Sequence, residues 1–378
     1  MNEKSANLNS VATSGARTDT TFIRLSLLRE RLARADVDAM LVSSLPNIRY
    51  LTGFSGSNAL VVVTPRECAL LTDFRYATQV ADEVGNHVAV RIEPQSLWTG
   101  LWAWLAVASG TERIGFETMH LLHRDFQRLL EQGARWQWRP LTDEIERLRE
   151  CKDADELSCI EDAVGVAQRA LQRTLQQLGA GLTETQVAGI LEHELRNEGS
   201  EGFPFATIVA SGPHSALPHA RAGNRIIERG DFVLIDFGAI TRGYCSDITR
   251  TVVVGKATEH QREVYDVVAG ANAKSSGAIR AGVRGMDADA VARDYIHARG
   301  YGEAFGHSLG HGIGLEIHEA PRLAKSADGV LPARAVVTIE PGVYLAGWGG
   351  VRIEDDVFLA SDGPRVLTSF TRELLEIT

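Results

Sequence analysis

Four carboxylates and one imidazole in the second half of the chain are the residues best suited to chemistry. They are Asp236, Asp247, His311, Glu340 and Glu354. Each lies in a short, glycine-punctuated segment otherwise rich in Val, Ile and Phe, where a charged group is costly to bury. Four like charges in one apolar place repel one another strongly, and divalent cations would offset that repulsion. The residue types therefore predict a carboxylate-rich site for two metal ions, with hydrolysis as its chemistry.

Two predicted hairpins bring the carboxylates together in pairs. In the first, apolar runs end at Asp236 and resume after Asp247, and the segment 241–243 between them is typical of a turn. Folding the chain there places Asp236 opposite Asp247. In the second, apolar runs lead to Glu340 and to Glu354, with a glycine-rich turn between them. Folding there places Glu340 opposite Glu354.

Like charges that lie directly opposite each other destabilise a hairpin unless a cation lies between them. The alternative is that these acids are solvated strand ends bound to Arg or Lys. The apolar residues on both sides of each acid favour the metal site, because an unpaired charge is costly to bury.

Histidines near these segments add imidazole to the set. The segment 307–319 holds His307, His311 and His318 among glycines, which let a backbone approach a ligand closely. His219 lies shortly before the first hairpin. A lone histidine is usually an ordinary core or surface residue. Close to the candidate carboxylates, however, an imidazole can bind zinc, manganese, iron or cobalt. An imidazole that is not a ligand can donate to a developing oxyanion or relay a proton.

The elements that position these residues fall into two domains. Helices and strands alternate over 22–145, which predicts an α/β layer domain. Pro140 and the charged stretch 143–155 mark the boundary. Over 146–378, helix pairs each lead to a carboxylate-bearing hairpin, which predicts an α+β domain with a pseudo-two-fold internal repeat. Periodic apolar residues predict helices over 22–35, 153–178, 260–281 and 286–299, and a capping box predicts the start of another at Thr183.

Length and composition narrow the class of protein. The chain has 378 residues, enough for two domains, and its net charge of −10 argues against a nucleic-acid partner. No apolar run approaches the ~20 residues that cross a bilayer. The four cysteines are typical of reduced thiols, which predicts a cytoplasmic protein. The segment 1–21 is expected to be a disordered tail, with an organelle transit peptide as the alternative.

The motifs around the candidate ligands resemble those of a known family. The second domain is similar to the catalytic domain of the pita-bread metallopeptidases, which include methionine aminopeptidase, prolidase (Xaa-Pro dipeptidase) and aminopeptidase P. The matching segments are GDFVLIDFGAITRGYCSDITRT, GHSLGHGIGLEIHE, TIEPGVY and VRIEDDV. Through NIRYLTGFSGSNAL and LLTDFRY, the first domain resembles the creatinase/prolidase-type N-terminal domain. Methionine aminopeptidases generally lack that domain, so the resemblance points to the proline-peptidase branch.

This resemblance implies a set of metal ligands. It assigns two divalent metal ions to Asp236, Asp247, His311, Glu340 and Glu354. Asp247 and Glu354 would bridge the ions and Asp236 would bind one through both oxygens, while His311 and Glu340 would complete the other. Manganese is the expected metal, with cobalt, zinc or iron as alternatives.

The resemblance also implies catalytic roles. A hydroxide that bridges the ions would attack the carbonyl carbon before proline, with Glu340 taking or relaying its proton. His219 and His318 would hold the carbonyl oxygen, and His307 would help to orient the proline side or the leaving group. Arg352 would support a bridging carboxylate.

Several alternatives stay open at this point. An aminopeptidase P, which releases the residue before a proline in second position, is favoured over a prolidase that cuts only dipeptides. A catalytically inactive peptide-binding relative and a hydrolase of phosphoester-like compounds are other possibilities. Creatinase shares both domains without using the metals, and the complete ligand set argues against its reaction. Tyr344 either hydrogen-bonds in the site or packs in the core. A homodimer is expected on family grounds alone.

Overall fold

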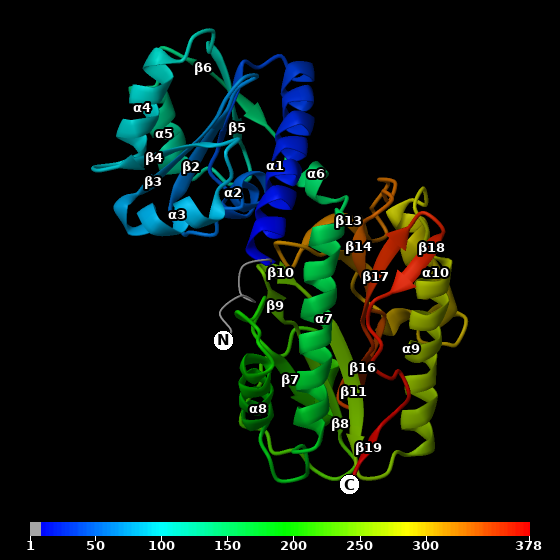
Figure 1. Cartoon of the computed structure of the whole chain (residues 1–378). Helices are drawn as coiled ribbons and strands as arrows, with labels where there is room; N and C mark the ends of the chain where they lie inside the picture. The colour runs from blue at the N-terminus through cyan, green and yellow to red at the C-terminus, as the bar shows by residue number, and fades with distance from the viewer. Residues whose placement is uncertain (1–8) are drawn as a thin grey trace, which may run out of the picture. The chain divides into compact units, whose positions relative to one another are not determined.

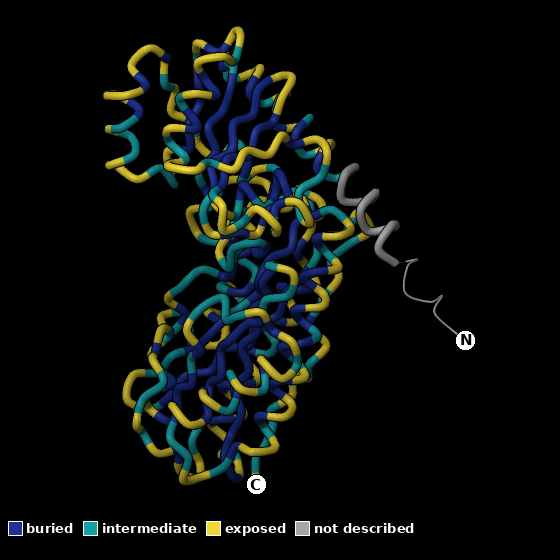
Figure 2. The backbone as a smooth tube through the Cα atoms, turned by 60° about the vertical axis from the view of Figure 1, so that its left-hand side comes forward, coloured by how far each residue is buried: buried dark blue, intermediate teal, exposed yellow. Residues whose placement is uncertain are grey.

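A computed structural model describes the backbone of residues 9–378 and the side chains from Thr20 onward. The chain divides into two compact units, one that ends at Arg149 and one that starts at Glu150 (Figure 1). This division lies four residues after the predicted boundary at 145/146. Each unit has its own buried interior (Figure 2).

The N-terminal unit is an α/β layer domain, as predicted. Its helices are α1 (Asn9–Arg34), α2 (Leu45–Thr52), α3 (Ala77–Glu83), α4 (Leu97–Val107), α5 (His123–Gln132) and α6 (Glu146–Arg149). Its strands are β1 (Ala39–Val42), β2 (Ala59–Val63), β3 (Cys68–Asp73), β4 (Ala89–Glu93), β5 (Arg113–Glu117) and β6 (Gln137–Leu141). They form one sheet in the order β4-β3-β2-β1-β5-β6, with α4 and α5 on one side and α1 on the other (Figure 1).

Helix α1 begins earlier than the sequence analysis predicts. Residues 9–21, which belong to the predicted disordered tail, lie in α1, and residues 1–8 lie outside the described part of the chain. Leu25, Leu28 and Leu32 are buried along one face of α1, as the leucine stripe predicts. Once that face is packed, a segment without proline can extend the helix toward the N-terminus, since propagation is easier than nucleation.

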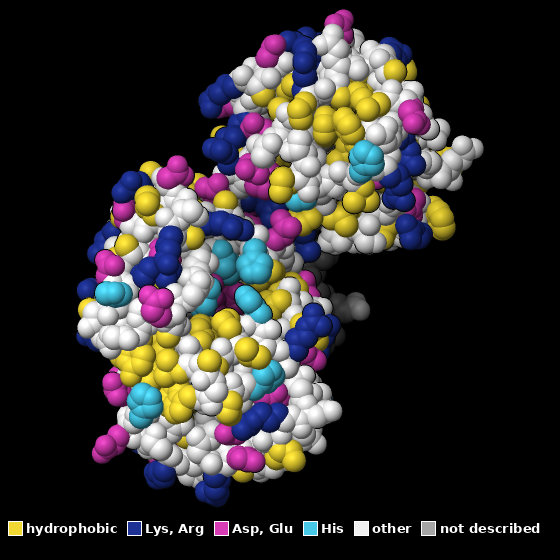
Figure 3. Space-filling view, turned by 180° about the vertical axis from the view of Figure 1, so that it is seen from behind, with side chains coloured by type: hydrophobic (Ala, Val, Ile, Leu, Met, Phe, Trp, Pro, Cys, Tyr) yellow, Lys and Arg dark blue, Asp and Glu magenta, His cyan; other side chains and the backbone are white. Residues whose placement is uncertain are grey.

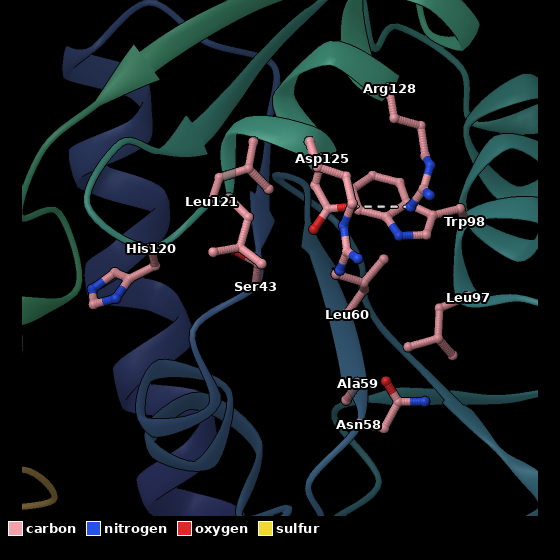
Figure 4. A pocket seen from close by; sticks show the side chains of 12 residues that line it. Ser43, Asn58, Ala59, Leu60, Leu97, Trp98, His120, Leu121, Asp125 and Arg128 are labelled. Carbon is pink, nitrogen blue, oxygen red and sulfur yellow. Dashed lines mark hydrogen bonds and ion pairs between the residues drawn. The ribbon is translucent and has the colours of Figure 1, made fainter.

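A pocket of about 280 Å³ opens in the N-terminal unit near the carboxyl end of β1 (Figure 4). Trp98 of α4 and Arg128 of α5 line it, and the Arg128 guanidinium lies 4.9 Å from the centre of the Trp98 ring. Arg128 also binds Asp125 at 3.0 Å. The two charged groups therefore satisfy each other, and the described residues that line the pocket include one imidazole and one carboxylate but no cluster of them.

The C-terminal unit is built from two similar halves. In the first half, α7 (Ala154–Leu175) and α8 (Glu184–Asn197) precede β7 (Ile208–Ser211), β8 (Phe232–Phe237), β9 (Ile240–Thr241), β10 (Tyr244–Cys245) and β11 (Ile248–Val254). In the second, α9 (Glu259–Ala278) and α10 (Gly285–His297) precede β12 (Gly310–Gly312), β13 (Glu319–Leu323), β14 (Val336–Ile339), β15 (Gly342–Leu345), β16 (Gly349–Arg352), β17 (Asp355–Ala360) and β18 (Gly363–Val366). The chain ends with β19 (Glu376–Ile377).

Each half packs its helix pair on a largely antiparallel sheet. The sheet orders are β19-β11-β8-β7 and β13-β12-β14-β17-β18, and β9–β10 and β15–β16 are separate two-stranded hairpins. One apolar core joins α7 and α8 to β8 and β11, and another joins α9 and α10 to β14, β16 and β17. This arrangement confirms the predicted α+β domain and its pseudo-two-fold repeat.

Capping boxes fix the starts of three helices in this unit. Thr183 and Gln186 form the box that the sequence predicts for α8. Asp153 caps α7 and Thr258 caps α9 in the same way. In each box the side chain at the helix start accepts a backbone N–H that would otherwise have no partner in the helix. Helices α7, α9 and α10 lie within a few residues of their predicted ranges.

Candidate active site

The first hairpin differs from its predicted register. β8 and β11 pair Asp236 with Thr249, so that Asp247 lies opposite Gly238 instead of Asp236. The turn consists of residues 242–243, and both have positive φ angles (49° and 77°). It is a tight two-residue turn, whereas the sequence predicts a turn over 241–243. The resulting shift of two residues keeps Asp236 and Asp247 on one face of the hairpin, because side chains alternate with a period of two.

The second hairpin has the predicted register. β14 pairs with β17 and β15 with β16 in one continuous register, which places Glu340 opposite Glu354 at the break between them. The amide of Glu340 donates to Leu309 O at 2.9 Å, and that of Glu354 to Thr249 O at 3.1 Å. The two amides point out of the hairpin, so the residues form a non-hydrogen-bonded pair, in which side chains come closest.

The two hairpins and the histidine segment converge. One ligand atom from each of Asp247, His311 and Glu354 lies within 4.8 Å of the other two. His311 Nε2 lies 3.7 Å from Asp247 Oδ2 and 3.5 Å from Glu340 Oε1. Seen from behind, histidine side chains gather around a hollow in this unit with acidic side chains inside it (Figure 3). The structure therefore assembles His311 of β12 with residues that directly precede β11, follow β14 and precede β17 into one site.

Burial and mutual repulsion mark these carboxyl groups. Burial, reinforced by the charges of neighbouring acids, raises the pKa of Asp247 and that of Glu354 well above their usual ranges. Burial also raises the pKa of Glu340 to about 8, although Arg352 opposes the change. Fully buried acids in this state would be stabilised by added positive charge.

Two carboxylate oxygens of the candidate ligands have no hydrogen-bond donor among the described residues. Oδ1 of Asp236 and Oδ1 of Asp247 are buried without a hydrogen-bond partner among the described residues. Buried polar atoms are normally satisfied, so each such atom calls for an explanation. Carboxylate oxygens and an imidazole nitrogen within a few ångströms are a donor set that divalent manganese, cobalt, zinc or iron accepts. The residues present therefore fit a divalent metal ion.

Arg352 connects the carboxylates to His307. Its guanidinium binds Asp236 Oδ2 at 2.5 Å and donates to the Tyr344 hydroxyl at 2.7 Å. The Tyr344 hydroxyl lies 2.9 Å from His307 Nε2, and His307 Nδ1 lies 2.8 Å from Ser308 O. Since a carbonyl only accepts, Nδ1 carries the proton and Nε2 accepts from Tyr344. Tyr344 thus hydrogen-bonds in the site.

Burial keeps two groups of this chain, His307 and Tyr344, uncharged near neutral pH. Burial, with help from Arg352, lowers the pKa of His307 to about 4, and burial raises the pKa of Tyr344 to about 12. Near neutral pH, His307 is therefore an uncharged acceptor and Tyr344 an uncharged donor. Arg352 is the positive member of the chain and offsets part of the charge of Asp236.

Three neighbours of the ligands were not identified from the sequence. Thr249 donates to Glu354 Oε2 at 2.6 Å, and Thr338 accepts from the amide of His311 at 3.1 Å. Asp356 accepts from the amide of Asp247 at 3.1 Å. Each lies two positions from a candidate ligand along a strand and so shares its face. That period of two is the signal that could have pointed to them.

The other histidines lie around the same cluster. His311 and His318 place their ring centroids 4.4 Å apart. His311 Nδ1 lies 3.0 Å from Gly312 O, which leaves Nε2 toward the acids. His219 and His318 are exposed, whereas His307 and His311 are partly buried. The carbonyl of Pro218, next to His219, accepts from Arg352 at 3.2 Å, which ties that loop to the site.

Comparisons with known proteins agree with this geometry. Residues 158–361 match the model of metallopeptidase family M24, and residues 24–151 match the creatinase/prolidase N-terminal domain. The chain belongs to metallopeptidase family M24. It is therefore a hydrolytic enzyme of the pita-bread fold, as the sequence motifs indicate.

Relatives in this family match nearly the whole chain. An uncharacterized peptidase, YqhT, of Bacillus subtilis is 38% identical over 93% of this chain and 99% of its own length. An Xaa-Pro dipeptidase of Pyrococcus horikoshii is 35% identical over 92% of this chain and 97% of its own. The solved Xaa-Pro dipeptidase from Bacillus anthracis has a TM-score of 0.91 at 37% identity, covering 94% of this chain and 99% of that one.

A second solved structure that is similar to this chain is named for a different activity. The X-Pro aminopeptidase from Thermotoga maritima has a TM-score of 0.86 at 38% identity, covering 92% of this chain and all of that one.

None of the helices in the described part of the chain is long and apolar enough to span a membrane.

Proposed function

We propose that this enzyme is a metal-dependent exopeptidase that hydrolyses the peptide bond before proline. The observation that carries the proposal is a cluster of buried acids in which the pKa values of Asp247 and Glu354 are raised, and in which one oxygen each of Asp236 and Asp247 has no donor among the described residues. The family and the names of the relatives support the same class of reaction. All five candidate ligands are present, which argues against an inactive peptide-binding relative.

Five residues would hold two divalent ions. They are Asp236, Asp247, His311, Glu340 and Glu354, which supply carboxylate oxygens and one imidazole nitrogen. When bound, the ions would supply a water that loses its proton near neutral pH and would polarise the scissile carbonyl. Manganese is the proposed metal, since a site of mainly carboxylate oxygens suits it, and the ligands also accept cobalt, zinc or iron.

The remaining residues of the site would act on the substrate. Glu340, whose Oε1 lies 3.5 Å from His311 Nε2 in the cluster, would receive the proton that the attacking water gives up. The exposed imidazoles of His219 and His318 would donate to the carbonyl oxygen as it gains negative charge. Arg352 would orient Asp236 through their ion pair, and His307 would position the proline side through its bond to Tyr344.

Proline limits how the enzyme can select its substrate. The nitrogen of an X-Pro bond carries no hydrogen, so no donor on the scissile amide can be recognised. Selection must come from the ring and from the termini of the peptide. Several sequence relatives and solved structures are named Xaa-Pro dipeptidase or prolidase, and these names support dipeptides as the substrates of this enzyme. From the sequence alone, the dipeptidase is the alternative and the aminopeptidase is favoured. Longer peptides with proline second are the second candidate substrate, because a similar solved structure is the X-Pro aminopeptidase from Thermotoga maritima.

Two substrates separate these activities. Purified protein with added manganese would be given Ala-Pro and, separately, a tetrapeptide with proline second, and the products identified by chromatography. Cleavage of Ala-Pro alone is the expected result. Release of the first residue from the tetrapeptide would instead establish the aminopeptidase, and failure to cut either peptide would overturn the X-Pro specificity.

We also propose a homodimer in the cytoplasm, which gel filtration with light scattering and localisation of the tagged protein would test.

A further inference from the structure

Asn272 of α9 reaches the backbone that carries two of the proposed ligands. Its side chain is fully buried, and Nδ2 donates to Ile339 O at 2.9 Å and to Ile353 O at 3.1 Å. These two residues immediately precede Glu340 and Glu354. A single amide group therefore links the two strands at the point where the paired carboxylates leave them.

Pro341 leaves the carbonyl of Ile353 without its usual donor in the strand ladder, and the Asn272 side chain supplies one. The continuous register places Ile353 opposite Pro341, and the amide of Ile353 donates to Pro341 O at 3.4 Å. In a hydrogen-bonded antiparallel pair the partner normally returns a second bond, but proline has no N–H. The carbonyl of Ile353 thus lacks its donor in the ladder, and the Asn272 amide takes that place.

We propose that Asn272 is a positioning residue that sets the separation of Glu340 and Glu354, and through it the affinity of the site for divalent metal. The inference rests on the proposed function, in which both carboxylates bind metal. Their mutual repulsion acts to separate the strands at the very position where the ladder lacks a bond. Groups that orient metal ligands typically contribute about 10- to 100-fold in metal affinity.

The first test is a titration of chelator-stripped, full-length protein with manganese, followed by calorimetry. Asn272→Leu removes both donors at similar volume and should weaken manganese binding about 10- to 100-fold with the far-UV circular dichroism unchanged. Ser276→Ala is the matched control. It removes another buried polar group one helical turn away and should leave binding at the wild-type value.

A second-site change distinguishes positioning from packing. Pro341→Ala in the Asn272→Leu background restores a backbone N–H opposite Ile353, and it should recover at least about 5-fold of the lost affinity, since the ladder bond can then form. A packing defect at position 272 would not respond to this change. If Asn272→Leu does not fold, Asn272→Ala provides the same pair of measurements.

The outcomes are separable. Wild-type manganese affinity in Asn272→Leu, or a loss that Pro341→Ala fails to restore, would overturn the positioning role while leaving the proposed function intact. Absence of manganese binding by the unmodified protein would overturn the proposed function itself, and this inference with it.

Discussion

The two units bury carboxylates in opposite ways. In the N-terminal unit, Glu117 lies at the end of β5 and accepts from the amides of Ser43 and Ser44, the Ser43 hydroxyl and the Asn47 side chain, at 2.6–3.0 Å. In the C-terminal unit, Asp236 and Asp247 each keep a buried oxygen without a donor among the described residues. Both kinds of acid are almost inaccessible to solvent.

This difference separates a structural acid from a functional one. A buried carboxylate whose oxygens are filled by fixed donors holds loops together, as Glu117 holds the segment after β1. A buried carboxylate that lacks donors and faces other acids is stable only when something positive is supplied. Glu117 also ends an apolar run, so the apolar flank alone does not separate the two kinds of acid, which differ in the backbone amides that the fold brings near them.

The largest predicted effect comes from removing Asp247, which has one buried oxygen without a donor among the described residues. Asp247→Ala should reduce kcat/KM by at least about 1,000-fold, because Asp247 is a proposed metal ligand and the loss of such a ligand costs several kcal/mol in the transition state. Bound metal, measured by mass spectrometry, should fall in parallel while the unfolding midpoint changes little. Asp247→Asn keeps the shape and should lose activity similarly, and an active Asn variant would contradict the metal role.

An imidazole at the edge of the cluster should matter for rate and not for metal content. His219→Ala should lower kcat/KM about 100-fold, the scale of one lost donor to a developing oxyanion. Steady-state kinetics and metal analysis on the same sample would show it, with His193→Ala, an exposed histidine of α8, as the control. A parallel loss of metal would show that His219 is a ligand or supports one.

The hydroxyl between Arg352 and His307 gives a smaller effect. Tyr344→Phe removes both of its hydrogen bonds and should lower kcat/KM about 10-fold, as loss of a group that orients the site typically does. Tyr265→Phe, at a buried tyrosine of α9, serves as the matched control in the same assay. Unchanged kinetics in Tyr344→Phe would mean that this chain of groups does not act in turnover.

The structural acid should show the reverse behaviour. Glu117→Gln leaves at least one of its donors unpaired and should lower the free energy of unfolding by about 1–3 kcal/mol. Metal content and kcat per folded molecule should stay the same. Chemical denaturation together with the peptidase assay would test this, and a loss of metal in Glu117→Gln would erase the proposed distinction between the two units.

Much of the scaffold could be predicted because local signals decided it. The capping box at Thr183, the leucine stripe of α1 and the pairing of Glu340 with Glu354 follow from patterns within a few residues of one another. The first hairpin was misplaced by two residues, because its register depends on positive φ angles at 242–243 that the residue types only partly reveal.

The supporting contacts of the site could be predicted less well. Arg352 was identified from its position two residues before Glu354, but its actual partner is Asp236, which the chain brings near only on folding. Asn272 could not be found, since its two bonds join α9 to strands more than sixty residues away. Contacts of this kind depend on the packing of helices on sheets, which a sequence pattern does not specify.

The central claim is that the acids of the C-terminal unit require metal. The most direct measurement is the rate of Ala-Pro hydrolysis by chelator-stripped protein as manganese is added back, with bound metal counted in the same samples. We expect no turnover without metal and recovery of activity as two ions bind per chain. Full activity in metal-depleted buffer would contradict it.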